Sequence, residues 1–278
     1  MFLQVIDTCV DTPEKNMAKD LELLESLSLS PACLLHFYEW EGPSATYGYF
    51  SHPEKFLKSE GIAKHNLRLA KRPTGGGIIF HQFDFAFSVL LSAMHPQYSL
   101  NTLNNYRFVN SVVAQSIVDT MQLTALPQLL EIEDCVCKEL PQKQFCMAKP
   151  TVYDLIIDGR KVAGAAQRRS KMGYLHQGSI SLQMPSNEFL EDLLRPETGV
   201  ANAMQSSSYP LLGDSQDPIA LNKAKYALKH ALIKNFNTIL YNDIPRGLID
   251  HLLTERNPTD TAIYIGKNSH LKAKFRAG

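Results

Sequence analysis

The feature that most constrains the fold is a two-residue turn, Asp158-Gly159, placed between two short apolar runs. Leu155-Ile156-Ile157 precedes the turn and Val162-Ala163 follows it. Asp-Gly supplies the positive φ angles that the tightest hairpin turns require. The sequence therefore predicts an antiparallel hairpin over Tyr153–Gln167, which a regular strand–helix–strand repeat would not contain.

Other apolar patterns predict strands and helices in an irregular order. Strands are expected at Phe2–Asp7, Cys33–Tyr38, Thr46–Phe50, Leu67–Arg72, Ile78–Phe80, Phe85–Leu91 and Ser179–Leu182. Helices are expected at Asn16–Leu29, Asn101–Leu123, Asn187–Leu194 and from Asp217-Pro218 to about Asn235. The Gly42-Pro43 turn signal predicts that the second and third strands pair antiparallel. We therefore expect an α+β fold with mixed, largely antiparallel sheets covered by helices.

Charge and cysteine usage exclude several classes of protein. The 278 residues carry 28 Lys and Arg against 28 Asp and Glu, which argues against nucleic-acid binding and against membrane-surface binding. No apolar run is long enough for a membrane span, and Met1–Asp11 lacks the pattern of a secretory signal. Five cysteines, an odd number, suit a reducing compartment, so we expect a cytoplasmic protein. Cys135 and Cys137 are too close for an ordinary zinc pair, so no metal is expected.

A glycine-rich segment, Arg72-Pro73-Thr74-Gly75-Gly76-Gly77, separates two predicted strands. Three consecutive glycines allow backbone amides to approach a ligand without interference from side chains. The segment lacks the Gly-Lys-Ser/Thr of a phosphate loop, and no helix follows it. A plain turn between strands explains this pattern as well as a binding loop does.

Lys161 follows the hairpin turn and precedes the small residues Ala163, Gly164, Ala165 and Ala166. Strand alternation predicts that Lys161, Ala163 and Ala165 share one face, where they form a groove floor with an ammonium group at one end. A solvent-exposed lysine beside a turn is the ordinary alternative.

Cys146 lies between Lys143 and Lys149, whose positive charges favour a thiolate. A buried, unreactive cysteine is the common alternative. His81, His36 and His176 lie in or beside predicted strands and are candidate general bases, although each fits a hydrogen-bonded structural role.

Together these segments resemble the lipoate-protein ligase and octanoyltransferase family, which shares its catalytic fold with biotin-protein ligases. The resemblance extends from about Val5 to about Leu194. The segments that carry it are Asn16-Met17-Ala18, Phe37-Tyr38-Glu39-Trp40, Tyr47-Gly48-Tyr49-Phe50, Arg72–Gly77 with His81, and Gly159–Gln167. The chain departs from the family at Gln82, where an aspartate commonly follows the histidine; Asp84 lies two positions further on.

The resemblance implies transfer of an octanoyl or lipoyl group to a lysine of lipoyl domains. These are the lipoyl domains of 2-oxoacid dehydrogenase complexes or the glycine-cleavage carrier protein. An octanoyltransferase takes the acyl group from acyl carrier protein onto a cysteine and needs no cofactor. A ligase instead activates lipoate with ATP and Mg. A third possibility is a non-catalytic acyl or lipoyl-domain binder.

The segment from Cys146 to Asp154 resembles the nucleophile segment of one cysteine-dependent octanoyltransferase branch, whereas Gly77 and Arg168-Arg169-Ser170-Lys171 resemble ligases. The resemblance implies Cys146 and Lys161 as catalytic residues. It implies substrate binding by Arg72, Thr74, Gly75, Gly76, Gly77, His81, Gly164, Ala165 and Ala166. We expect residues 1–240 to form the catalytic domain, and residues 241–278 to form a short helical extension with a basic tail rather than an accessory domain.

Overall fold

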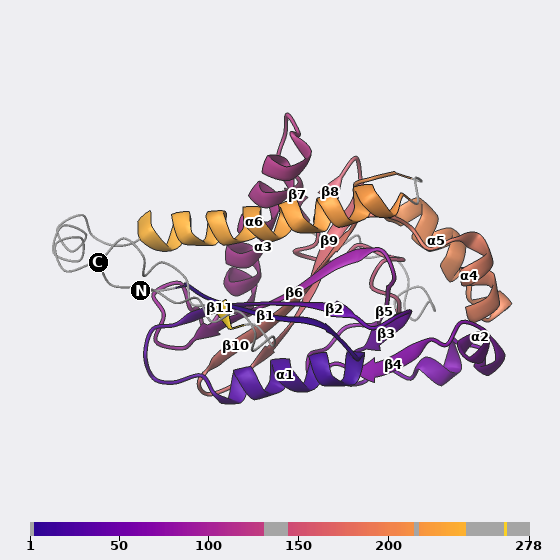
Figure 1. Cartoon of the computed structure of the whole chain (residues 1–278), viewed down its shortest axis with the longest axis horizontal. Coiled ribbons are helices and arrows are strands. Elements are labelled where there is room, and N and C mark those ends of the chain that lie inside the picture. The colour runs from indigo at the N-terminus through magenta and orange to yellow at the C-terminus, as the bar shows by residue number, and fades with distance from the viewer. Residues whose placement is uncertain (1–2, 131–143, 214–216, 243–263, 266–278) are drawn as a thin grey trace, which may run out of the picture.

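The computed structural model describes residues 3–130, 144–213, 217–242 and 264–265, which form two sheets and the helices around them (Figure 1). The larger sheet has the strand order β11-β1-β2-β6-β10-β9-β8-β7, and the smaller has the order β4-β3-β5. The strands are β1 (Leu3–Asp11), β2 (Cys33–Trp40), β3 (Ser44–Tyr47), β4 (Arg68–Lys71), β5 (Ile78–His81), β6 (Asp84–Ser92), β7 (Gln128–Leu129), β8 (Leu155–Ile157), β9 (Arg160–Arg169), β10 (Gly173–Ser181) and β11 (Tyr264–Ile265). The α-helices are α1 (Pro13–Glu25), α2 (Ser59–Lys64), α3 (Thr102–Met121), α4 (Asn187–Leu193), α5 (Val200–Ser207) and α6 (Pro218–Asn242).

Most neighbouring strands run antiparallel, as in the pairs β2–β6, β6–β10, β10–β9 and β9–β8. Parallel pairing occurs between β1 and β2, between β1 and β11, and between β3 and β4. The predicted α+β fold with mixed, largely antiparallel sheets is therefore confirmed.

Helices cover both faces of the larger sheet. On one face, α3 contributes Val109, Val113 and Ile117 to the main core, and α6 contributes Leu232 and Phe236. On the other face, α1 packs its leucines against strands β2, β6 and β10. Figure 1 shows α6 along the top of the molecule and α1 below the strands. None of the helices among the described residues is both long and apolar enough to cross a membrane.

The hairpin predicted at Asp158-Gly159 is present, with φ angles of 50° and 73° at the two turn residues. The prediction that Lys161, Ala163 and Ala165 share one face is wrong for Ala163. Ile156 pairs with Lys161 but Leu155 pairs with Ala163, so the pairing is irregular at this point. This bulge lets Lys161 line a cavity on one face while Ala163 packs into the main core on the other.

The predicted antiparallel pairing of Cys33–Tyr38 with Thr46–Phe50 is also wrong. Strand β2 lies between β1 and β6, so both of its edges are occupied in the larger sheet. After the turn at Gly42, which has a φ of 74°, the chain forms β3 in the smaller sheet. The turn was predicted correctly, but the sheet that receives the next strand depends on contacts distant in sequence.

Helix α6 extends further than the predicted end near Asn235 and remains packed through Leu240, which is buried. Most of residues 241–278, including the basic tail from Lys267 to Arg276, lies outside the described residues. The division into residues 1–240 and 241–278 therefore stays a prediction.

We predict that α6 is an integral part of the fold. Phe236 is fully buried between α3 and α6, so Phe236→Ala should lower the free energy of unfolding by about 3–5 kcal/mol. Ile219 on the same helix is 78% exposed, and Ile219→Ala should change the free energy of unfolding by less than about 0.5 kcal/mol. Urea denaturation of both variants measures the difference. Equal, small effects would mean that α6 is not part of the cooperative unit.

Candidate active site

A cavity of about 260 Å³ lies on the α1 side of the sheet, between the larger sheet, the glycine-rich loop and residues 145–151. Most of the residues predicted for the site line it: Arg72, Gly76, Gly77, His81, Cys146, Lys161, Gly164, Ala165 and Ala166. Thr74 and Gly75 are not among the lining residues, although both belong to the loop that forms one wall. Distant segments of the chain thus meet where the sequence predicted a site.

Lys161 is buried, with 3% of the residue exposed. Its Nζ lies 2.7 Å from Oδ2 of Asp154 and donates to the backbone carbonyl of Cys146 at 2.7 Å. A Cβ added to Gly164 would lie 2.3 Å from Cε of Lys161, so only glycine leaves room for this lysine side chain. Gly164 therefore makes room for the side chain of Lys161 and also lines the cavity.

Asp154 is held by its own loop. Its Oδ2 accepts hydrogen bonds from the backbone N–H of Thr151 at 2.7 Å and from the Thr151 hydroxyl at 2.9 Å. Asp154 is buried, with 2% of the residue exposed, and its carboxylate pairs with the buried ammonium of Lys161. Sequence reasoning noted Asp154 only within a family resemblance and gave it no role, because the pairing appears only once the hairpin folds against this loop.

Cys146 lies beside the guanidinium of Arg72, with Nη2 3.8 Å from Sγ. Arg72 is buried and also donates to the hydroxyl of Thr46 and to the carbonyls of Gly75 and Gly77. It therefore holds the glycine-rich loop and faces the sulfur at once. Two lysines were predicted to lie near Cys146. Lys149 lines the cavity, and Lys143 lies outside the described residues.

The glycine-rich loop needs glycine where other backbone approaches closely. A Cβ on Gly77 would lie 2.2 Å from the carbonyl oxygen of Gln144. Gly76 has a φ of 86°, and a Cβ there would lie 3.6 Å from Sγ of Cys146. The glycines thus bring the loop backbone against the cysteine, as a plain turn would not require.

His81 belongs to a hydrogen-bonded chain under the cavity. Its Nδ1 donates to Oδ2 of Asp84 at 2.7 Å, and its Nε2 lies 2.7 Å from the hydroxyl of Thr46. Ser179 also donates to Asp84. His81 thus pairs with the buried carboxylate of Asp84, although Gln82 directly follows the histidine.

A second buried hydrogen-bond network connects the glycine-rich loop to strand β10 and helix α1. The Thr74 hydroxyl donates to the side-chain carbonyl of Gln177 at 2.6 Å, and Gln177 donates to Asp20 on α1 at 2.6 Å. Asp20 also accepts from Ser88 and from His36. Sequence reasoning missed Gln177 and Asp20, because neither lies in a motif near the loop.

The other cysteines and histidines have structural surroundings. Burial raises the pKa of the Cys33 thiol to about 12, whereas Cys9 is exposed on β1. Cys135 and Cys137 lie outside the described residues. Burial lowers the pKa of His176 to about 3, so this imidazole is neutral near neutral pH. Among the described residues, no three His, Cys, Asp or Glu side chains gather as metal ligands do.

A model of the family described as the lipoyl protein ligase A/B catalytic domain matches residues 12–210. The chain belongs to this family. The Octanoyltransferase LipM of Anoxybacillus flavithermus is 30% identical over 246 residues, which cover 84% of this chain and 86% of that protein.

Solved structures agree in fold with this family. A structure of a bipartite lipoate protein ligase and its E2 lipoyl domain from Thermoplasma acidophilum has a TM-score of 0.60 at 18% identity, covering 85% of this chain and 84% of that one. A lipoate-protein ligase A bound with ATP has a TM-score of 0.60 at 18% identity, covering 85% and 86%. These similarities establish the fold and leave the activity to the site itself.

The ion pair of Asp84 predicts how stability depends on pH. Burial raises the pKa of this carboxyl, but the charge of His81 and hydrogen bonds from His81 and Ser179 outweigh burial and lower the pKa overall. A carboxyl with a lowered pKa in the folded state stabilises the protein above its unfolded pKa, and this contribution is lost as the pH falls through the folded pKa. Asp84→Asn should lower the free energy of unfolding by about 1–3 kcal/mol near neutral pH.

The deficit of Asp84→Asn relative to wild type should shrink in acid, and urea denaturation at neutral and acidic pH measures it. Asp158→Asn at the hairpin turn is the matched control, with an expected change within about 0.5 kcal/mol at both pH values. A deficit that is the same at both pH values would contradict the assigned role of the Asp84 charge.

Proposed function

We propose that the chain is an octanoyltransferase of protein lipoylation in the cytoplasm. It would take an octanoyl group from octanoyl-acyl carrier protein onto Cys146 and pass it to a lysine of a lipoyl domain, without ATP or metal. One observation carries the proposal. A thiol, the Arg72 guanidinium and the Lys161 ammonium meet at one end of a largely apolar cavity.

The shape of the cavity fits a medium-length acyl chain. Its lining runs from Gly164 on β9 across Gly178 on β10 and Ala86 on β6 to Trp40 on β2. Neighbouring strands lie about 4.8 Å apart, so this path crosses about 14 Å of sheet. Each methylene group buried there contributes about 0.8 kcal/mol to binding.

In the first step, the Cys146 thiolate attacks the carbonyl carbon of the donor thioester. The new carbon–sulfur bond forms as the bond to the donor sulfur breaks, and the donor leaves as a thiolate. Arg72 stabilises negative charge on the attacking sulfur, and Lys161 stabilises the oxyanion of the tetrahedral intermediate. Thioester exchange is nearly isoenergetic, so the enzyme needs no external energy source.

In the second step, the neutral amine of the lipoyl-domain lysine attacks the enzyme thioester. The amide bond forms, the bond to Cys146 breaks, and the departing sulfur takes up the proton that the amine loses. Cys146 is then a thiol again. The two half-reactions share one cavity, so steady-state kinetics should be ping-pong.

The test is the intact mass of the enzyme and of an acceptor lipoyl domain after separate incubation with octanoyl-acyl carrier protein and with lipoate plus ATP and Mg. We expect a hydroxylamine-labile octanoyl adduct on the wild type, no adduct on Cys146→Ala, and loss of acceptor modification in Lys161→Ala. Undiminished modification by Cys146→Ala with lipoate and ATP would instead establish the ligase. An acceptor that gains no group from either donor would contradict both enzymatic functions and favour a non-catalytic binder.

The lysine pocket gives a second prediction. Gly164→Ala would place a methyl group against the flexible end of Lys161, so the side chain should move away from Asp154 while the backbone stays in place. We expect the rate of Cys146 octanoylation to fall by about a hundredfold, the scale of a lost oxyanion donor. The thermal midpoint should also fall, because the buried carboxylate of Asp154 loses its cation, so the rate is measured well below the midpoint of the variant. Full activity of Gly164→Ala would contradict the role of Lys161.

A further inference from the structure

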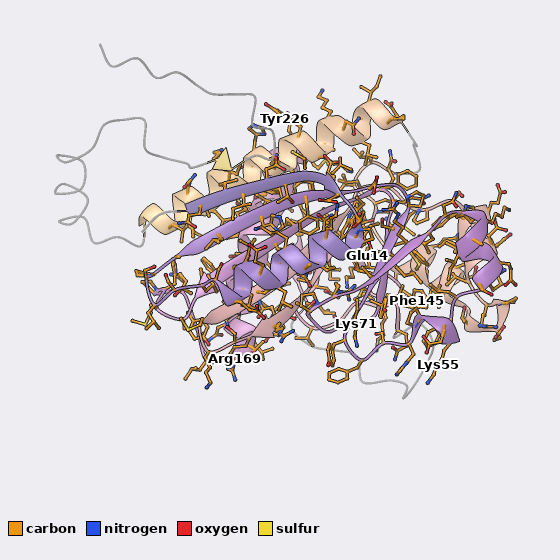
Figure 2. All side chains as sticks on the ribbon, turned by 60° about the horizontal axis from the view of Figure 1, so that its bottom comes forward. Glu14, Lys55, Lys71, Phe145, Arg169 and Tyr226 are labelled. Atoms are coloured by element: carbon orange, nitrogen blue, oxygen red, sulfur yellow. The ribbon has the colours of Figure 1, made fainter. Side chains whose placement is uncertain are left out.

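An exposed aromatic and cationic surface lies at the edge of the glycine-rich loop. We define this rim patch as Tyr49, Phe50, Lys71 and Arg168, all of them exposed. Phe50 is 85% exposed and Tyr49 is 54% exposed, and Nζ of Lys71 lies 4.0 Å from the Tyr49 ring centroid. Figure 2 labels Lys71 along the lower edge of the molecule. The Tyr49 and Phe50 rings lie 5.1 Å apart, and together with Lys71 they form a contiguous exposed surface that a partner can cover.

The rim patch is fixed to the loop that faces the sulfur. The backbone N–H of Tyr49 donates to the carbonyl of Thr74 at 3.1 Å, and the Ser51 hydroxyl donates to the carbonyl of Gly76 at 2.9 Å. A Cβ on Gly48 would lie 2.0 Å from that Gly76 oxygen, which shows how closely the two loops pack. Gly76 in turn lies beside Cys146. The glycine-rich loop therefore lies between the rim patch and the sulfur of Cys146 and contacts both.

The exposed charge of this region is mainly positive. Residues 44–53, 68–77 and 164–173 contain six lysines and arginines and no aspartate or glutamate. Arg72 is buried and Arg68 pairs with Glu41 at 2.7 Å, and the other four, Lys71, Arg168, Arg169 and Lys171, are exposed. Arg168 reaches the carbonyl of Pro73 at 3.3 Å, which places its guanidinium over the glycine-rich loop. Such a surface fits a partner that is acidic around an apolar contact point.

The reach of the reacting groups selects the partner. An acyl carrier protein delivers its thioester on a long prosthetic arm, so its folded part can dock well away from Cys146. An acceptor lysine has only its own side chain, so the backbone on either side of it must come close to the mouth of the cavity. A fixed surface next to the sulfur thus suits the acceptor better than the donor.

We propose that the rim patch is the docking surface for the acceptor lipoyl domain, and that this domain carries acidic side chains beside its target lysine. This inference rests on the proposed octanoyl transfer. Phe50 contacts an apolar point of the domain, and Lys71 and Arg168 pair with its carboxylates.

The test uses the wild type, Phe50→Ser and Lys71→Glu, each loaded on Cys146 with octanoate before the acceptor is added. Transfer to the lipoyl domain is measured beside transfer to hydroxylamine, a nucleophile too small to need docking. Loading from octanoyl-acyl carrier protein is measured separately. Matched controls are Leu29→Ser, at a side chain 69% exposed, and Lys223→Glu, at an exposed lysine of α6.

We expect the second-order rate constant for the lipoyl domain to fall by about tenfold or more in Phe50→Ser and in Lys71→Glu, and to stay unchanged in the controls. Loading and transfer to hydroxylamine should keep their wild-type rates. The loss in Lys71→Glu should be relieved by an acid-to-lysine substitution beside the target lysine of the lipoyl domain.

Wild-type rates of transfer to the domain in both variants would overturn the inference. Slower loading from acyl carrier protein with normal transfer to the domain would also overturn it, because the donor would then dock at the rim patch. Equal losses with the domain and with hydroxylamine would assign the patch to the cavity instead. A wild type that never forms an acyl-enzyme refutes the proposed function itself, which is a different result from all of these.

Discussion

The buried ion pair between Asp154 and Lys161 is the interaction on which the cavity depends. It joins strand β9 to the loop before the hairpin, and both side chains are 4% exposed. Removing two charges from water costs free energy that a single contact does not recover. Here the Thr151 hydrogen bonds to Asp154 and the bond from Lys161 to the Cys146 carbonyl offset that cost. The pair therefore fixes the ammonium of Lys161 beside the backbone of Cys146.

On the opposite wall of the cavity, the buried cation is Arg72. Arg72 holds the glycine-rich loop through two backbone carbonyls and directs its guanidinium toward the sulfur of Cys146. His81 and Asp84 extend this polar chain through Thr46. Buried charged and polar groups beside an apolar slot suit a substrate with a long apolar tail and a reactive carbonyl.

The sequence predicts well what depends on neighbours in the chain and poorly what depends on distant contacts. The hairpin at Asp158-Gly159 and the helix over Asn101–Leu123 follow from local turn chemistry and helical spacing, and both are present. The bulge that turns Ala163 toward the core was not predictable, because a strand pattern alone assumes strict alternation. The sheet of β3 likewise depends on which edges of β2 are already occupied.

The site shows the same limit. Motif resemblance singled out Cys146, Lys161 and Arg72 as candidates, because they lie in recognisable segments. Their surroundings, which include Asp154, Gln177 and Asp20, become visible only when those segments meet. The most direct test of the account is a double-mutant cycle on the rate of Cys146 octanoylation with Asp154→Asn and Lys161→Met. If both residues act through one ammonium group, the double variant is no slower than Lys161→Met alone. Losses that add in full would contradict this account.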